Sequence, residues 1–290
     1  MKVNNSLMDL MRGEFLMSLQ GVNAYAGIFH KIITGEEISF EKTTKAILSI
    51  FDDNGKPVYP NSNGMLDAPA GSVAVVDMIG PIMKYGDWWS YGGLEIVNAL
   101  RAADNNPNII GTVFNVDSPG GAVSAIGAFK EFGKTKKKPI VGLADQCASL
   151  GYWAMCAISD YKMADNNVSA AFGSVGIVMS YVDTRKYLES FGYVFHDVYP
   201  DESAHKNEAW NLMLKGDYEL IKKEHLSPLA IKFQDDVRAA CTNLKEEIGV
   251  LTGKTFGADQ ALEYGMIDAI GSQNQAIQRL HVMSELNHYK

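Results

Sequence analysis

From Ser72 onward, short runs rich in β-branched residues alternate with stretches whose apolar residues recur at helical spacing. The runs predict strands, and each stretch between them has about the length of a crossover helix. An alternation of this kind is typical of an α/β domain in which helices pack on a sheet. The expected strands are 73–79, 109–116, 140–144, 174–182 and 193–199, and the expected helices are 93–103, 122–132, 150–158 and 184–191.

Two regions differ from this pattern. Residues 1–70 combine an apolar periodicity that predicts an amphipathic helix near the start with a segment dense in Gly, Pro, Asn and Asp. We therefore expect an N-terminal extension and linker over 1–70 and one domain over 71–290. Residues 216–249 predict one or two helices that cover the core or contact a neighbouring subunit, with Pro228 as a kink or break.

Composition excludes several classes of protein. The 290 residues are 47% hydrophobic, which is enough for a globular core, and the net charge of −8 argues against a nucleic-acid partner. The longest apolar stretch, 148–158, falls short of the roughly 18–20 residues that a membrane span needs. Three cysteines are too few for a disulfide framework or a four-cysteine zinc site. We expect a cytoplasmic protein with no membrane anchor, metal or cofactor.

The segment 115–121, Asn-Val-Asp-Ser-Pro-Gly-Gly, follows an expected strand and precedes an expected helix. Without Cβ atoms, Gly120 and Gly121 allow a sharp turn and can direct amide N–H groups at a ligand, as an oxyanion hole requires. A tight strand-to-helix turn without any ligand explains the glycines equally well.

Ser149 opens the expected helix 150–158. It is either an N-cap, whose hydroxyl accepts from a helix amide, or a nucleophile beside the free N–H of Leu150. Cys147 is a rival nucleophile, although a buried cysteine more often behaves as a small hydrophobe.

A serine nucleophile needs a base. His196 and His205 lie near the expected core strands, but neither has a carboxylate at a telling spacing. Lys206 is the other candidate, and it must be desolvated for its pKa to approach neutrality.

Five ordered motifs, spanning about 72 to 272, resemble the signal peptide peptidase A family, and within it the short phage and prophage members related to the head-protein C peptidase. The matching segments are 115–121 (the S-P-G-G turn), 148–153 (A-S-G-G-Y-Y), 172–176 (T-G-S-I-G), 203–206 (S-G-x-x-K) and 257–271 (A-x-x-x-G-L-V-D-x-x-G). Two positions depart from the family pattern, because Leu150 and Ala204 replace glycines. Neither change removes a reacting group.

The resemblance implies a role for each matching residue. Ser149 would be the nucleophile, Lys206 the general base and Ser174 the hydroxyl that orients the lysine. Gly121 and Leu150 would donate the oxyanion-hole amides. A further set would shape the turn or bind substrate, namely Gly120, Tyr152 and Val175.

The resemblance also implies a Clp/crotonase-like fold of repeated ββα units in a superhelix, with an N-terminal helical extension. It implies a homo-oligomeric Ser/Lys endopeptidase acting on a peptide or protein, such as a phage head or scaffold protein, in the host cytoplasm or prohead. A cytosolic signal-peptide-degrading peptidase and a non-catalytic head component remain alternatives. A Clp-type histidine base is disfavoured because Ser174 stands at its position, and an enoyl-CoA hydratase-like function rests on fold alone.

Overall fold

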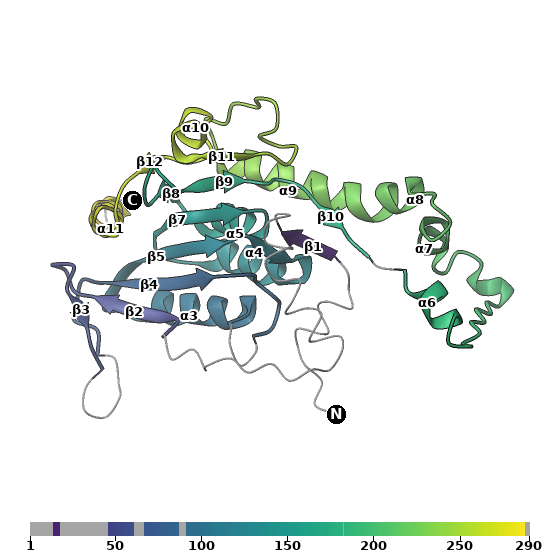
Figure 1. Cartoon of the computed structure of the whole chain (residues 1–290). Coiled ribbons are helices and arrows are strands. Elements are labelled where there is room, and N and C mark those ends of the chain that lie inside the picture. The colour runs from purple at the N-terminus through teal and green to yellow at the C-terminus, as the bar shows by residue number, and fades with distance from the viewer. Residues whose placement is uncertain (1–13, 18–45, 61–66, 87–90, 182, 288–290) are drawn as a thin grey trace.

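The computed structural model describes residues 14–17, 46–60, 67–86, 91–181 and 183–287. Its centre is a mixed sheet of nine strands in the order β11-β9-β7-β5-β4-β2-β3, with β8 beside β7 and β12 beside β8 (Figure 1). The strands β4, β5 and β7 are parallel. The strands of this sheet are β2 (Leu48–Phe51), β3 (Pro57–Val58), β4 (Ser72–Ile79), β5 (Ile109–Ser118), β7 (Ile140–Ala148), β8 (Tyr161–Ala164), β9 (Ala171–Gly173), β11 (Thr255–Gly257) and β12 (Ala269–Ile270).

Helices cover both faces of the sheet, so the strands are apolar on both sides. Val73 and Val75 of β4 pack with residues of α11, whereas Val76 and Met78 join the core on the opposite face. The α/β prediction is therefore confirmed. The covering helices are α3 (Gly93–Asn105), α4 (Ile126–Thr135) and α5 (Leu150–Ile158) on one face and α11 (Gln273–Asn287) on the other.

The predicted strands 73–79, 109–116 and 140–144 and helix 93–103 are confirmed, with ends that differ by a few residues, and helix 150–158 has the predicted bounds. Helix α4 begins later than predicted because a short strand, β6 (Gly120–Ala122), and a 3₁₀ turn, Val123–Ala125, precede it. The remaining short helix beside the sheet is α10 (Ala258–Glu263).

The structure differs from the expectations at four places. Within the described part of the predicted strand 174–182, only β10 (Val178–Met179) is a strand, since β9 ends at Gly173. The predicted strand 193–199 is not a strand, because its apolar residues are exposed rather than packed on the sheet. Within the predicted N-terminal helix, Glu14–Met17 form a strand, β1, and the rest lies outside the described residues. Strands β2 and β3 lie in the predicted extension and linker, yet they belong to the main sheet.

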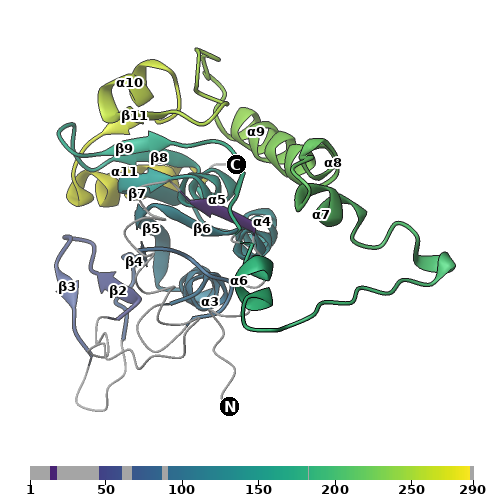
Figure 2. The same ribbon diagram turned by 45° about the vertical axis from the view of Figure 1, so that its right-hand side comes forward.

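Residues 183–218, here called the arm, project from the body of the molecule (Figure 2). The arm contains α6 (Arg185–Glu189), a 3₁₀ turn (Asp201–Ser203) and α7 (Glu208–Met213), and none of the residues of α6 is buried. It leads through α8 (Glu219–Ile221) and a π-helical turn (Lys222–Leu226) to α9 (Ser227–Ala240).

Helix α9 returns from the arm to cover the core. Pro228 lies in its first turn, where proline is tolerated, directly after the π-helical turn that interrupts the regular α-helix, so the predicted kink or break falls at this point. Phe233 and Val237 are fully buried, and Phe233 stacks on Trp153 of α5 with 4.5 Å between ring centroids. The predicted core-covering helix is confirmed. Among the described residues, no helix is long and apolar enough to span a membrane.

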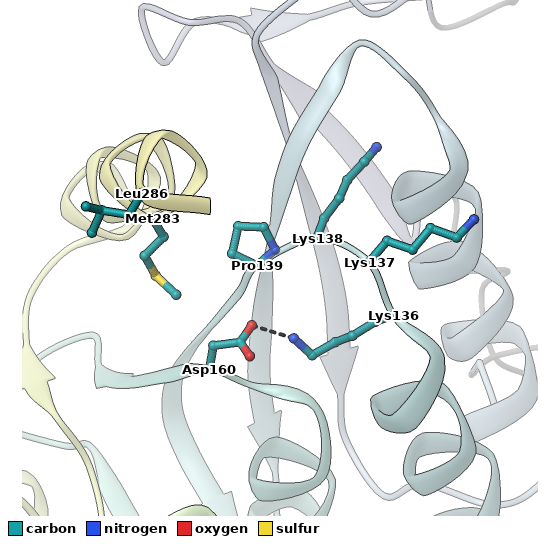
Figure 3. Close-up of a pocket in the computed structure, with 7 residues that line it drawn as sticks. All are labelled: Lys136, Lys137, Lys138, Pro139, Asp160, Met283 and Leu286. Carbon is teal, nitrogen blue, oxygen red and sulfur yellow. Dashed lines mark hydrogen bonds and ion pairs between the residues drawn. The ribbon is translucent and has the colours of Figure 1, made fainter. Parts of the chain in front are cut away.

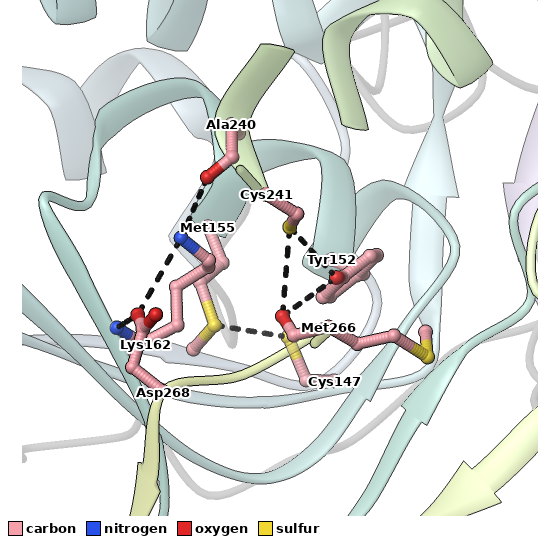
Figure 4. Close-up of polar contacts among 8 residues, drawn as sticks. All are labelled: Cys147, Tyr152, Met155, Lys162, Ala240, Cys241, Met266 and Asp268. Carbon is pink, nitrogen blue, oxygen red and sulfur yellow. Dashed lines mark hydrogen bonds and ion pairs between the residues drawn. The ribbon is translucent and has the colours of Figure 1, made fainter. Parts of the chain in front are cut away.

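A buried lysine joins three parts of the fold (Figure 4). Lys162 of β8 is 3% exposed, and its ammonium donates to the carbonyl of Ala240 at the end of α9, at 2.9 Å. Its Nζ lies 3.6 Å from the Asp268 carboxylate, which also accepts the Lys162 backbone N–H at 2.7 Å. The contacts tie β8 to the end of α9 and to the segment before β12.

We expect Asp268→Ala to lower the free energy of unfolding by about 1–3 kcal/mol, because it leaves a buried ammonium without its counter-ion. Lys162→Met, which removes the charge but keeps a long apolar side chain, should cost less. Urea denaturation of both variants measures the difference. A loss from Lys162→Met as large as that from Asp268→Ala would contradict this account.

Candidate active site

The site is built where three strands end together. Strand β7 pairs with β5 through Cys147 opposite Ser118, and with β9 through Ala148 opposite Gly173. The next residue, Ser149, donates its backbone N–H to the Gly173 carbonyl at 2.8 Å, and its own carbonyl accepts from Trp153 at 2.9 Å. The backbone of the serine is thus held by a strand on one side and by helix α5 on the other.

Ser149 has a strained backbone. Its φ of 54° and ψ of −118° lie in a region that favours glycine. Within the described structure its side chain caps no amide of α5, so the N-cap interpretation is not what the fold uses. A strained serine at a sharp strand-to-helix turn is the backbone geometry of a nucleophile elbow.

The glycine turn beside it depends on both glycines. Gly120 has a φ of 112°, and a Cβ on Gly121 would lie 1.9 Å from the carbonyl oxygen of Ile82. The Gly120 carbonyl accepts from the Ile82 N–H at 3.0 Å. Because the C=O and N–H of a trans peptide point in opposite directions, the Gly121 N–H points away from Ile82. That N–H is therefore not used by Ile82 and can donate to a partner on the opposite side.

Ser118, which sequence reasoning did not single out, holds this turn in place. Its hydroxyl donates to the Gly80 carbonyl at 2.7 Å and accepts the Gly120 N–H at 3.2 Å. Gly151 of α5 packs so closely on Ser118 that a Cβ would lie 3.3 Å from the Ser118 Cβ. The first turn of α5 therefore lies against the glycine turn. The sequence signal that could have identified Ser118 was its place in the Ser-Pro-Gly-Gly segment.

Ser174 lies at the end of the neighbouring strand. Because Ala148 is opposite Gly173, the two serines, Ser149 and Ser174, leave adjacent strands at the same edge. Ser174 also has a positive φ, 53°, and its N–H donates to the Lys254 carbonyl at 2.8 Å. The structure thus brings the predicted nucleophile and the predicted orienting hydroxyl to one place.

Two predicted substrate-binding side chains lie in the core. Tyr152 and Val175 are fully buried, and the Tyr152 hydroxyl donates to the Met266 carbonyl at 2.8 Å (Figure 4). Neither side chain is open to a bound peptide in this arrangement.

Lys206 lies away from these residues. It is exposed and lies on the arm shortly after the 3₁₀ turn Asp201–Ser203, where its N–H donates to the Ser203 carbonyl at 3.0 Å. The neighbouring His205 is also exposed and pairs with Glu208 at 2.8 Å. The arm that carries Lys206 projects from the body (Figure 2), whereas Ser149 lies at the start of α5 within the body.

Cys147, the rival nucleophile, is sealed in the core. It is fully buried, and burial raises the pKa of its thiol well above the ordinary value. The thiolate needed for attack is therefore disfavoured.

The basic cluster after α4 has a structural role (Figure 3). The Lys136 ammonium pairs with Asp160 at 2.5 Å, Lys137 donates to the Asn105 side chain at 3.1 Å, and Lys138 donates to backbone carbonyls at the end of α3. Burial, partly offset by Asp104, lowers the pKa of Lys138. Lys136 thus ties the end of α4 to the segment between α5 and β8, and Lys137 and Lys138 tie the segment before β7 to the end of α3.

Strain at Ser149 gives a stability prediction. Ser149→Gly should unfold with a free energy about 1 kcal/mol higher than Ser149→Ala, because glycine adopts this φ and ψ without strain. Thermal denaturation of the two variants tests this. Equal stability would mean that the turn is relaxed.

The glycine turn gives a second prediction. Gly121→Ala should cost about 1–3 kcal/mol, since the new methyl group collides with the Ile82 backbone. It should also abolish labelling of Ser149 by a fluorophosphonate. Gly127→Ala is the matched control, because Gly127 lies inside α4 with open space around its Cβ position and should tolerate the change. Normal labelling of Gly121→Ala would refute the role of this turn.

A strained serine at a strand-to-helix turn, set beside an outward-pointing glycine amide, is of the class used for acyl transfer by a serine nucleophile. The model of Peptidase family S49 matches residues 133–287, more than half of the chain. The chain belongs to this family of serine peptidases.

Curated relatives agree with the family. The chain is 26% identical over 213 residues to Protease 4 of Haemophilus influenzae, covering 71% of this chain and 34% of the relative. It is 23% identical over 202 residues to the "Putative signal peptide peptidase SppA" of Enterococcus faecium, covering 66% of this chain and 56% of the relative. The chain thus spans between a third and somewhat over half of these relatives.

Among solved structures, two variants of the 1510-N membrane-bound stomatin-specific protease are similar to the chain. One is in complex with a substrate peptide and covers 74% of this chain and 81% of its own, at 13% identity and a TM-score of 0.47. The match to the other covers 72% of this chain and 84% of that protein's chain, with the same identity and TM-score.

Proposed function

We propose that the chain is a serine endopeptidase in which Ser149 attacks a peptide carbonyl. The observation that carries the proposal is the strained conformation of Ser149, whose hydroxyl is not used as a helix cap and which stands beside the Gly121 turn. The Gly121 and Leu150 amides would bind the oxyanion that forms on attack. Membership of family S49 supports the same chemistry.

The base in this proposal is Lys206, with Ser174 as the hydroxyl that orients it. A neutral Lys206 takes the proton of the Ser149 hydroxyl as the Oγ–C bond forms, and then gives the proton to the leaving amine when the C–N bond breaks. Water, deprotonated by the same lysine, then hydrolyses the acyl-enzyme. The position of Ser174 beside Ser149 supports this assignment.

Lys206 reaches Ser149 in this proposal from a neighbouring copy, within a homo-oligomer. Two observations support it: the arm that carries Lys206 projects from its own body, and it exposes large apolar side chains that a soluble monomer rarely leaves uncovered. These side chains are Tyr187, Phe191, Tyr193, Val194 and Val198, all at least 61% exposed.

The finer biological role remains part of the proposal. The family resemblance of the motifs favours a phage or prophage peptidase that processes head or scaffold proteins in the host cytoplasm or the prohead. The same resemblance suggests that the mixed sheet, whose parallel strands are joined by α3 and α4, is a Clp/crotonase-like ββα superhelix. Incubating the protein with candidate head proteins and sequencing new termini by mass spectrometry tests the substrate class.

Mixing two inactive variants tests both the catalytic pair and its division between copies. Ser149→Ala and Lys206→Ala should each abolish peptide hydrolysis and keep the fold. After dissociation and reassembly in equal amounts, about a quarter of the sites should combine an intact serine with an intact lysine from the next copy. Hydrolysis should then return to about that fraction of the wild-type rate.

The control is Lys215→Ala, which changes another lysine of the arm and should leave hydrolysis unchanged. Activity retained by Lys206→Ala alone would refute the lysine base. Two inactive variants whose mixture stays inactive would show that both residues act within one chain.

A further inference from the structure

Strand β1 occupies a position in the candidate active site that its own sequence did not predict. It pairs antiparallel with β6 on one side and with β10 on the other, in a three-stranded sheet ordered β10-β1-β6 (Figure 1). Strand β6 holds Gly120 and Gly121, and β10 closely follows Ser174. The two partners of β1 are therefore the segments that flank Ser149.

The register places β1 directly against the proposed oxyanion donor. Leu16 is opposite Gly121, and Phe15 is opposite Ala122. The Gly120 carbonyl and the Ala122 N–H are both bonded to Ile82, so the intervening N–H and C=O of Gly121 point to the other side, where β1 lies. A donor and an acceptor of the glycine turn thus face the Leu16 backbone.

The space that β1 fills between the edges of β6 and β10 is here called the peptide-binding gap. A space of this kind can bind an extended peptide, because main-chain hydrogen bonds to both strand edges hold the peptide. Among the described strands, β10 pairs only with β1. Ser149 is 1% exposed, so a peptide cannot reach its hydroxyl unless a neighbour moves.

We infer that Glu14–Met17 is an internal occupant of the peptide-binding gap, which holds the peptidase inactive until this strand is displaced. The inference rests on the proposed function. A tethered strand has an effective concentration on the order of millimolar, so an intrinsic affinity of about 0.1 mM would suppress turnover about tenfold.

Leu16→Pro in the full chain tests the inference, since proline lacks the N–H that pairs with β6. Hydrolysis of a fluorogenic peptide should rise about tenfold over the wild type, which is the factor that an intrinsic affinity of about 0.1 mM gives. Amide hydrogen exchange at Gly121 and Ala122 should become faster in the same variant. A synthetic peptide of residues 11–20 should inhibit Leu16→Pro by raising the apparent KM, and the same peptide with proline in place of leucine should not.

The outcomes separate the two proposals. Equal hydrolysis by the wild type and Leu16→Pro, with Ser149 active in both, would overturn the inhibitory role and leave the peptidase intact. A wild-type chain that cleaves itself near residue 16, in a manner lost in Ser149→Ala, would make β1 a substrate and also overturn the inference. No hydrolysis and no labelling of Ser149 in any variant would overturn the proposed function, and this inference with it.

Discussion

The turn at Ser149 is the constraint around which the rest of the molecule is arranged. A non-glycine residue keeps such a conformation only when its surroundings fix it, at a cost on the order of 1–3 kcal/mol. Here the hydrogen bond to Gly173 fixes the serine from the sheet, and α5 fixes it from the helix layer. Because nearly every residue of α5 is buried, the helix cannot shift to relieve the strain. The rigidity of the core therefore maintains the geometry of the candidate nucleophile.

Local patterns predicted the central elements because, in this part of the chain, burial and local preference agree. Strand β4 is rich in β-branched residues, β4 and β7 are both largely buried, and α5 is apolar throughout. The prediction failed where pairing depends on distant residues. Residues 193–199 are rich in aromatic and β-branched residues, as strands are, but no strand in the described part of the chain pairs with them. Strand β1 is a strand only because β6 and β10 receive it.

The candidate site divides in the same way. Ser149, Gly120 and Gly121 could be predicted because a sharp strand-to-helix turn has a local sequence signature, and the structure brings them together with Ser174. The position of Lys206 could not be predicted, since it depends on the path of the arm and on any copy beside it. Tyr152 follows the serine in sequence, but the helical twist turns its side chain to the core and towards Met266.

The stacking of Trp153 on Phe233 makes the fluorescence of Trp153 sensitive to the packing next to the candidate site. The two rings are nearly parallel, at 8°, and the indole N–H donates to Asp236 at 2.6 Å. Trp153 lies four residues after Ser149 in α5, whereas Phe233 and Asp236 belong to the helix that continues from the arm. Its fluorescence therefore depends on how closely α9 is seated against α5. The chain carries an intrinsic chromophore at the junction between its candidate nucleophile and its arm, without any added label.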